Sequence, residues 1–216
     1  MSSNPAAYSP SETAVLLLDY HTKFHDFIQP TDRVGGMIST AEDLVTWARE
    51  SGLLIIHCLL DVWNQRPPNN TRANDRWDWV AAMVQGDPKS FREHDAIAPP
   101  FGTTDGNTYN ELTFIRRPGQ VSALHSTGLR EVLATRNIKH LVLGGMSTGG
   151  CVFATARSAV DEGFVASIVE AGCADPSEAK HKYMFESVFP HDFWVFSTAA
   201  DLIGQVQAEV SNASKL

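Results

Sequence analysis

Two residues that can carry out nucleophilic chemistry follow short apolar runs in this sequence. Asp19 follows the run AVLLL at residues 14–18, and Cys151 follows the run HLVL at residues 140–143 and the segment GGMSTGG. A thiolate can attack a carbonyl carbon, and a neighbouring carboxylate can carry the proton from the thiol to a leaving group. Each residue also has a purely structural interpretation, Cys151 as a buried packing residue and Asp19 as a capping or ion-paired carboxylate.

Cys151 stands near the start of a predicted helix, residues 150–162. Unpaired backbone N–H groups and the positive end of the helix dipole favour a thiolate there, so we expect the pKa of this thiol to be lowered. The same N–H groups are suited to an oxyanion formed by attack on a carbonyl. Arg116 and Arg117 end the run LTFI and would bring positive charge to the same region, unless both bind a structural carboxylate.

The elements that must position these residues are predicted from the pattern of apolar runs. The runs cover residues 14–18, 53–60, 112–115, 140–143, 164–169 and 193–196. Short continuous runs are typical of strands buried on both faces, and helical patterns between them, at residues 33–51, 126–136 and 150–162, predict a parallel sheet. Because ligands bind at the carboxyl ends of parallel strands, we expect one edge to gather Asp19, Asp61, Arg116 or Arg117, Cys151 and Glu170.

Residues 61–110 differ from the rest of the chain because they hold five of its eleven prolines and three of its five tryptophans. Long excursions of this kind are usually functional, and we interpret this one as a variable wall of the pocket. Trp77 is our candidate for substrate contact in it. We therefore treat residues 1–216 as one α/β domain, with residues 1–12 as a flexible arm or an oligomer contact.

The composition excludes several classes of function. The chain has 17 Lys and Arg against 25 Asp and Glu, a formal net charge of −8, which argues against a nucleic-acid partner. No run approaches the roughly 20 apolar residues that span a bilayer, so we expect no membrane partner. Three cysteines do not form a disulfide framework and indicate a reducing compartment, so we expect the protein to be cytoplasmic.

Together, these motifs resemble those of the isochorismatase-like cysteine hydrolases, which include nicotinamidases, N-carbamoylsarcosine amidohydrolases, and biuret and ureidoacrylate hydrolases. The matching segments are LDYHTKF at residues 18–24, SAL at 122–124, GMSTGGCV at 145–152 and EAGCAD at 170–175. The resemblance implies a three-layer Rossmann-like fold, with a six-stranded parallel sheet of order 3-2-1-4-5-6 and helices on both faces. It also implies an Asp–Lys–Cys triad, in which Asp19 and Cys151 take the first and third places.

Further features follow from the same resemblance. It implies a cis peptide bond between Met146 and Ser147, and an oxyanion hole made by the N–H groups of Ser147 and Cys151. The substrate would be a small molecule, and we expect a homo-oligomer, either a dimer or a tetramer. Phe24 matches an aromatic residue that packs on the substrate in relatives, although a plain core role is equally compatible with its position.

The sequence departs from the family at three points. Where the family has lysine, this chain has Arg116 and Arg117, and arginine does not readily give up a proton, which leaves proton transfer to Asp19. His21 replaces the usual Gln, as a pocket residue or a structural hydrogen-bonding group. The histidine that binds metal in nicotinamidases is absent after Asp61, so we predict no metal and no cofactor, and nicotinamide is a poor candidate substrate.

Three functions compete at this point. The leading hypothesis is hydrolysis of a C–N bond in a small amide or ureido substrate through an acyl-enzyme on Cys151. An isochorismate-type vinyl-ether hydrolase would need no nucleophilic cysteine. The third hypothesis is a catalytically weak binding or scaffold protein that retains the fold, which the missing lysine supports.

Overall fold

A computed structural model describes residues 4–28, 30–61, 72–84, 91–99, 110–117 and 119–213. Within these residues, six parallel strands form one sheet of order β3-β2-β1-β4-β5-β6. This order confirms the predicted fold. The strands are β1 (Thr13–Leu18), β2 (Leu54–Leu60), β3 (Glu111–Arg116), β4 (His140–Met146), β5 (Val165–Ala174) and β6 (Trp194–Phe196).

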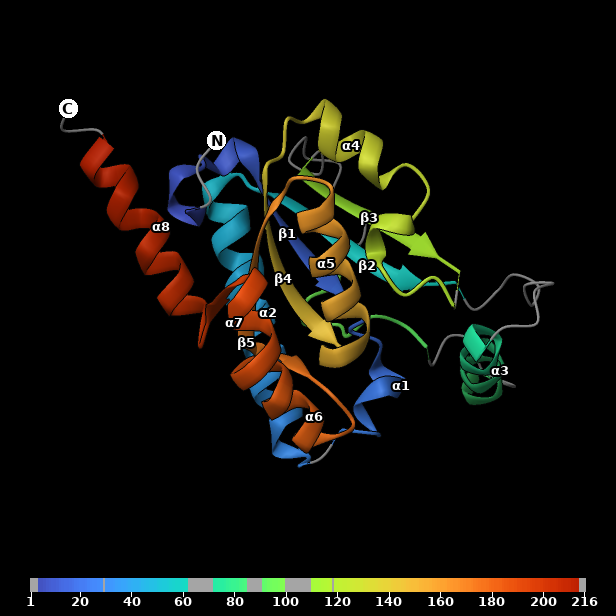
Figure 1. Ribbon diagram of the computed structural model, residues 1–216. Helices are drawn as coiled ribbons and strands as arrows, with labels where there is room; N and C mark the ends of the chain where they lie inside the picture. The colour runs from blue at the N-terminus through green and yellow to red at the C-terminus, as the bar shows by residue number, and fades with distance from the viewer. Residues whose placement is uncertain are drawn as a thin grey trace.

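Helices cover both faces of the sheet, as Figure 1 shows. They are α1 (Thr22–His25), α2 (Asp32–Ser51), α3 (Arg72–Val84), α4 (Leu129–Thr135), α5 (Phe153–Asp161), α6 (Glu178–Tyr183), α7 (Phe189–Asp192) and α8 (Ala199–Ala213). The predicted helix at residues 33–51 is confirmed, and Gly52 ends it in a left-handed conformation. No helix of the described residues is both long and apolar enough to cross a membrane.

The alternation of side chains along the strands explains why helices lie on both faces. In β1, Val15 and Leu17 pack in a core layer with residues of α2 and α8, whereas Leu16 and Leu18 pack in a second layer with residues of α4 and α5. Neighbouring strand residues point to opposite faces, so a run that is apolar at every position needs cover on both sides.

β4 is three residues longer than its predicted run because it continues through two glycines to Met146. At Gly145, φ is +145°, and a Cβ atom would lie 2.1 Å from the carbonyl oxygen of Leu18. Only glycine therefore allows β4 to pass this close to the end of β1, directly beside Asp19. The close approach places the end of β1, which Asp19 follows, next to the end of β4, which leads into the turn that contains Cys151.

β5 is also longer than predicted: it ends at Ala174, so the residue that follows the strand is Asp175 and not Glu170. Leu143 pairs with Ile168, but Gly145 pairs with Cys173, so the register shifts between the two pairs. This irregularity adds residues to β5 without ending it, a feature that an apolar run does not reveal. Glu170 is therefore a residue within the strand, and the expectation that it closes the strand was wrong.

The N-terminal segment contains buried residues in its described part, and the interpretation of residues 1–12 as a flexible arm or an oligomer contact stays a prediction. Tyr8 is buried, and its ring stacks on His140 at a centroid distance of 6.2 Å. Ala6 is also buried. Residues 1–3 lie outside the described residues, as does most of the predicted excursion at residues 61–110, where α3 and residues 91–99 are described.

A buried network ties the described part of this excursion to the sheet. His57 of β2 is fully buried, with its Nδ1 2.8 Å from Glu93 and its Nε2 3.0 Å from Glu111, while Arg49 donates to Glu111. Burial by itself disfavours the charged imidazole, but the hydrogen bonds to Glu111 and Glu93 outweigh it and raise the pKa of His57 to about 9. Protonated His57 therefore stabilises the folded chain.

We predict that this network makes the protein less stable at alkaline pH. The pKa of His57 rises from 6.5 to about 9 on folding, so its contribution is complete below pH 6.5 and is lost as the pH rises through 9. The expected loss in unfolding free energy is on the order of 3 kcal/mol. Urea denaturation between pH 6 and 9.5 measures it, with His57→Gln as the control. Equal pH dependence in both proteins would contradict the prediction.

Candidate active site

Asp19 is placed by an unusual backbone conformation at the end of β1. Its φ is +57°, in the left-handed region that aspartate tolerates better than most residues. Its N–H donates to the carbonyl of Cys58 at 2.9 Å, and its own carbonyl accepts from the N–H of His21 at 2.7 Å. These bonds hold the turn, and the carboxylate lines a cavity at the carboxyl edge of the sheet.

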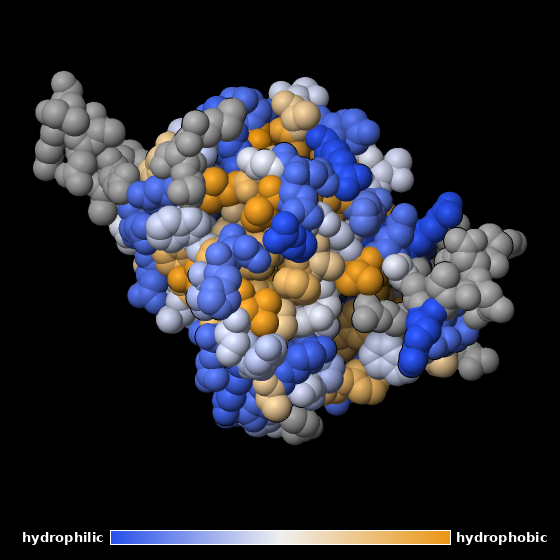
Figure 2. Space-filling view, viewed as in Figure 1, coloured by the Kyte–Doolittle hydropathy of each residue, from blue (hydrophilic) through white to orange (hydrophobic). Residues whose placement is uncertain are grey.

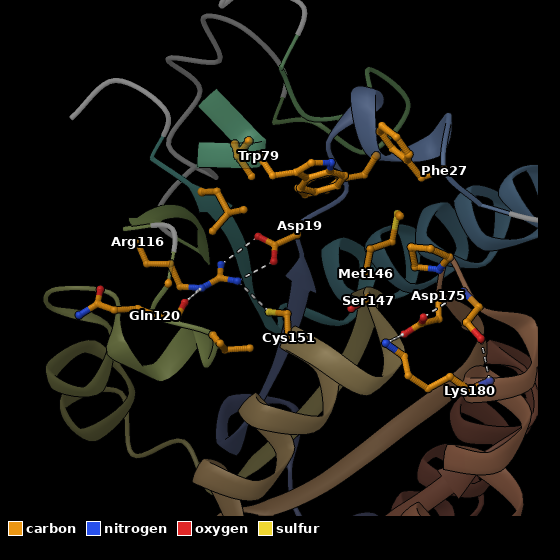
Figure 3. Close-up of a pocket in the computed structure, with 17 residues that line it drawn as sticks. Asp19, Phe27, Trp79, Arg116, Gln120, Met146, Ser147, Cys151, Asp175 and Lys180 are labelled. Atoms are coloured by element: carbon orange, nitrogen blue, oxygen red, sulfur yellow. Dashed lines mark hydrogen bonds and ion pairs between the residues drawn. The ribbon is translucent and has the colours of Figure 1, made fainter. Parts of the chain in front are cut away.

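Arg116, the last residue of β3, brings the carboxylate and the thiol together (Figure 3). Its Nη1 and Nη2 donate to the two carboxylate oxygens of Asp19 at 2.9 and 2.5 Å, and Nη2 is 3.0 Å from the sulfur of Cys151. Its Nε donates to the carbonyl of Gln120 at 2.9 Å. Arg116 is 3% exposed, whereas Arg117 is exposed, so Arg116 is the one of the two arginines that contacts Asp19 and Cys151.

We predict that replacing Arg116 by methionine destabilises the protein by about 3–5 kcal/mol, because the buried carboxylate of Asp19 would lose its cation. Arg117→Met is the matched control, since this neighbouring arginine is exposed, and we expect a change within about 0.5 kcal/mol. Urea denaturation at pH 7 measures both variants. Similar stabilities for the two would mean that the pair with Asp19 is not important for folding.

Burial raises the pKa of the Cys151 thiol; Arg116 acts in the opposite direction, and Asp19 raises the pKa further. Our expectation of a lowered pKa was therefore wrong for this site. The loss of hydration on burial outweighs the stabilising effect of a helix end here, because Cys151 is 5% exposed and shares the guanidinium of Arg116 with the carboxylate of Asp19. Cys151 thus rests as a thiol, and its proton needs an acceptor.

The loop before Cys151 has the expected backbone. The peptide bond between Met146 and Ser147 is cis, and residues Thr148–Val152 form a π-helical turn before α5. Within the turn, the N–H of Gly149 donates to Asp175 and that of Gly150 to the carbonyl of Ser147. Ser147 and Cys151, whose N–H groups we expected to form an oxyanion hole, both line the cavity.

A buried polar chain supports this loop from the side of α6. His181 has its Nδ1 2.8 Å from the hydroxyl of Thr148 and its Nε2 2.8 Å from Nη1 of Arg33. Because arginine can only donate, Nε2 accepts and Nδ1 carries the proton that it donates to Thr148. Burial and the nearby Arg33 lower the pKa of His181 to about 4, so the ring is neutral.

The cavity has a volume of about 520 Å³ and two chemically different sides. One side is apolar and includes Trp79 of α3, whose ring stacks on Phe24 at a centroid distance of 5.8 Å. The other side carries polar groups from the end of β5 and from α6. The lining residues are Asp19, Phe24, Phe27, Leu60, Trp79, Val80, Arg116, Gly119, Gln120, Val121, Met146, Ser147, Cys151, Asp175, Pro176, Ser177 and Lys180.

Two predicted substrate contacts, His21 and Trp77, do not line this cavity. His21 is buried behind its wall, where Nε2 accepts from the N–H of Leu60 at 3.0 Å and the ring stacks on Phe91. Burial lowers the pKa of His21 to about 4. Trp77 is two positions from Trp79 in the same helix, and residues two apart do not share a face. Trp79 therefore lines the cavity instead.

Asp175 and Lys180 were not predicted, because their segment closes the irregular β5 and opens α6. Asp61 closes β2, as predicted, but is not among the lining residues. Among the described residues, no group of three His, Cys, Asp or Glu side chains is arranged to hold a metal ion. The expectation that no metal or cofactor is needed remains a prediction.

The chain matches one protein family and resembles solved structures with the same fold. The model of the isochorismatase domain matches residues 13–201. Among solved structures, a cysteine hydrolase from Pseudomonas syringae pv. phaseolicola has a TM-score of 0.72 at 19% identity, covering 94% of this chain and 95% of that one. An isochorismatase family protein from Burkholderia thailandensis has a TM-score of 0.67 at 18% identity, covering 91% and 96%.

Curated relatives match over shorter stretches. A maleamate amidohydrolase from Pseudomonas putida is 28% identical over 152 residues, which are 67% of this chain and 63% of the relative. An uncharacterized isochorismatase family protein from Escherichia coli O157:H7 is 32% identical over 103 residues, covering 48% of this chain and 50% of the relative. The chain thus matches less than two thirds of the length of these relatives.

Proposed function

Because the chain belongs to the isochorismatase family, we propose that it is a cysteine hydrolase that cleaves a C–N bond of a small amide or ureido substrate through an acyl-enzyme on Cys151. The observation that carries the proposal is the contact of Arg116 with both Asp19 and Cys151 at the wall of one cavity. The name of the maleamate amidohydrolase relative supports the same class of reaction.

The first half of the reaction forms the acyl-enzyme. Asp19 accepts the proton of the Cys151 thiol while sulfur bonds to the carbonyl carbon of the substrate, and the carbonyl oxygen becomes negative. The N–H groups of Ser147 and Cys151 stabilise this oxygen. The C–N bond then breaks, and protonated Asp19 returns the proton to the leaving nitrogen.

The second half releases the acid product. A water molecule gives a proton to Asp19 and attacks the thioester carbon. The carbon–sulfur bond breaks, and Asp19 returns the proton to sulfur, which restores the resting thiol. Arg116 stays protonated throughout and holds the carboxylate of Asp19 beside the sulfur, so the arginine replaces only the charge of the family lysine.

Intact-mass spectrometry during turnover of a panel of amides, ureides and isochorismate tests the proposal. We expect wild-type protein to gain the mass of the substrate minus its leaving amine or ammonia, on the peptide that contains Cys151. Consumption of isochorismate without an adduct would instead indicate the vinyl-ether reaction. Binding of ligands without any turnover would indicate a binding protein that retains the fold.

The setting of the reaction is part of the same proposal. The three cysteines of the described residues are buried and not in disulfides, which suits the reducing cytoplasm. We also propose a homo-oligomer, a dimer or a tetramer, with a small-molecule substrate. Sedimentation velocity measures the oligomeric state.

A further inference from the structure

The sulfur of Cys151 has a polar neighbour that the proposed reaction does not use. The hydroxyl oxygen of Thr155, four residues later in α5, lies 3.8 Å from this sulfur. Thr155 is fully buried beneath the surface drawn in Figure 2 and does not line the cavity. Arg116 reaches the same sulfur from the cavity wall at 3.0 Å, as Figure 3 shows. The contact with Thr155 therefore leaves the cavity side of the sulfur to a substrate.

The hydrogen bonds of Thr155 determine what its hydroxyl can do. Oγ1 accepts from the backbone N–H of Ala123 at 2.9 Å. A hydroxyl has one proton to donate, and a backbone N–H can only donate, so this bond leaves the proton of Thr155 for another acceptor. Within the described residues, the sulfur of Cys151 is the other atom in hydrogen-bonding contact with this hydroxyl. The sulfur is therefore the acceptor that the proton of Thr155 can reach.

The contact differs from the common one of a threonine in a helix. Such a hydroxyl often donates to the backbone carbonyl four residues earlier, which for Thr155 would be the carbonyl of Cys151. Here the hydroxyl lies against the side chain of that residue. The bond from Ala123 links α5 to the segment after β3 and holds the hydroxyl in this place. The donor is thus in position before the reaction begins.

The direction of the contact is fixed once the thiol loses its proton. In the resting state either group can donate, since the thiol and the hydroxyl each carry a proton. A thiolate can only accept, so the hydroxyl of Thr155 becomes the donor when Asp19 has taken the proton of Cys151. Cys151 is 5% exposed, and a poorly hydrated charge depends on the donors around it. Hydrogen bonds to a charged group are also about twice as strong as those between neutral groups.

The other donor to this sulfur is shared. Nη2 of Arg116 donates both to Asp19 and to Cys151, whereas the hydroxyl of Thr155 has no such second acceptor among the described residues. Burial raises the pKa of the Cys151 thiol, while Arg116 and the hydrogen bond with Thr155 act in the opposite direction. Two donors of different kinds therefore act on the sulfur.

We propose that the hydroxyl of Thr155 donates a hydrogen bond to the thiolate of Cys151 and, beside Arg116, stabilises the nucleophile during attack. This inference rests on the proposed function, since it names a further catalytic residue of the same site. The proton of the thiol still goes to Asp19, and Thr155 keeps its own proton throughout. The bond weakens when sulfur bonds to the carbonyl carbon and loses its charge, and it forms again when the carbon–sulfur bond breaks.

Thr155→Val tests the inference, because valine has nearly the same shape and no hydroxyl. The measurement is the rate at which iodoacetamide alkylates Cys151 across the neutral and alkaline pH range, followed by peptide mass spectrometry, and it needs no turnover. We expect alkylation of this variant to be about 3- to 10-fold slower at each pH, because less thiolate forms, although each thiolate is more nucleophilic. Thr155→Ser keeps the hydroxyl and should recover most of the rate.

Thr13→Val is the matched control. Thr13 is buried like Thr155 and its hydroxyl is hydrogen-bonded, but it lies at the amino end of β1, with Ser9 and His140. This variant should be alkylated at the wild-type rate. Thr155→Ala removes the hydroxyl without the bulk of valine and should show the same slowing, which covers the case that Thr155→Val does not fold.

Three results would overturn the inference. The first is alkylation at the wild-type rate in the Thr155 variants that lack the hydroxyl. The second is an equal slowing in Thr155→Ser, which would assign the effect to the methyl group and not to the hydroxyl. The third is an equal slowing in Thr13→Val, which would assign it to a general loss of stability.

Hydrolysis separates this inference from the proposed function. With an amide that the wild type hydrolyses, Thr155→Val should lower kcat by about 3- to 10-fold and leave KM nearly unchanged, because Thr155 does not line the cavity. If alkylation slows as expected but none of the proteins hydrolyses an amide, the hydrogen bond to the thiolate is supported and the proposed function fails. If amides are hydrolysed through Cys151 but Thr155→Val matches the wild type in both rates, the inference fails alone.

Discussion

The Cys151→Ala variant is expected to lose hydrolysis by on the order of 10⁶-fold in kcat, because alanine removes the thiol that forms the covalent intermediate, the one thiol among the described residues that line the cavity. Alanine removes only the thiol from a buried position. The fold should therefore persist, which circular dichroism checks. Single-turnover assays with the best substrate of the panel measure the loss, and the acyl adduct should disappear from the mass spectrum.

Cys58 and Cys173 provide matched controls for this experiment. Both are fully buried cysteines of the sheet, and neither lines the cavity. Cys58→Ala and Cys173→Ala should each cost some stability but keep near-normal activity per folded molecule. Substantial turnover by Cys151→Ala would refute the nucleophilic role and favour a reaction without a covalent intermediate.

The Asp19→Asn variant is expected to reduce the rate by roughly 10²- to 10⁴-fold. The amide is nearly the same size as the carboxylate but cannot accept the thiol proton. Attack by sulfur depends on an acceptor for the thiol proton, because burial keeps Cys151 protonated at neutral pH. Rate measurements at pH 7 and at higher pH test this reasoning, since alkaline pH would partly replace the missing base by ionising the thiol directly.

Asp61→Asn is the control for Asp19→Asn, because Asp61 also follows a strand of the sheet but does not line the cavity. We expect its rate to stay close to that of wild type. If Asp19→Asn folds normally and turns over at a near-normal rate, Asp19 serves only as the structural partner of Arg116.

The strands of the sheet and the two catalytic candidates, Asp19 and Cys151, could be predicted from the sequence because each depends on a short stretch of neighbouring residues. A continuous apolar run such as residues 14–18 indicates burial on both faces, and a carboxylate directly after such a run must lie at the carboxyl edge of the sheet. Cys151 was found from the glycine-rich segment that follows such a run and opens a predicted helix. The resemblance to a family supplied the strand order and the cis bond before Ser147, both of which the structure has.

The choice between Arg116 and Arg117 needed the register of the sheet. Neighbouring residues at the end of a strand point in opposite directions, so only one of the two can face Asp19. Arg116 pairs with Leu60 at the end of β2, and its side chain turns to the cavity. Register is set by packing between strands that are distant in sequence, and a single sequence carries no direct signal of it.

The sequence by itself determined the class of fold and the positions of Asp19 and Cys151, because these follow from short-range apolar patterns. Only the tertiary structure decided that Trp79 rather than Trp77 lines the cavity, and that Asp175 and Lys180 line it together with Cys151. Both outcomes depend on how α3 docks and on the irregular pairing of β5, which arise from contacts between distant segments. The raised pKa of the Cys151 thiol could not be predicted from the sequence either, because the groups that bury it come together only in the folded chain.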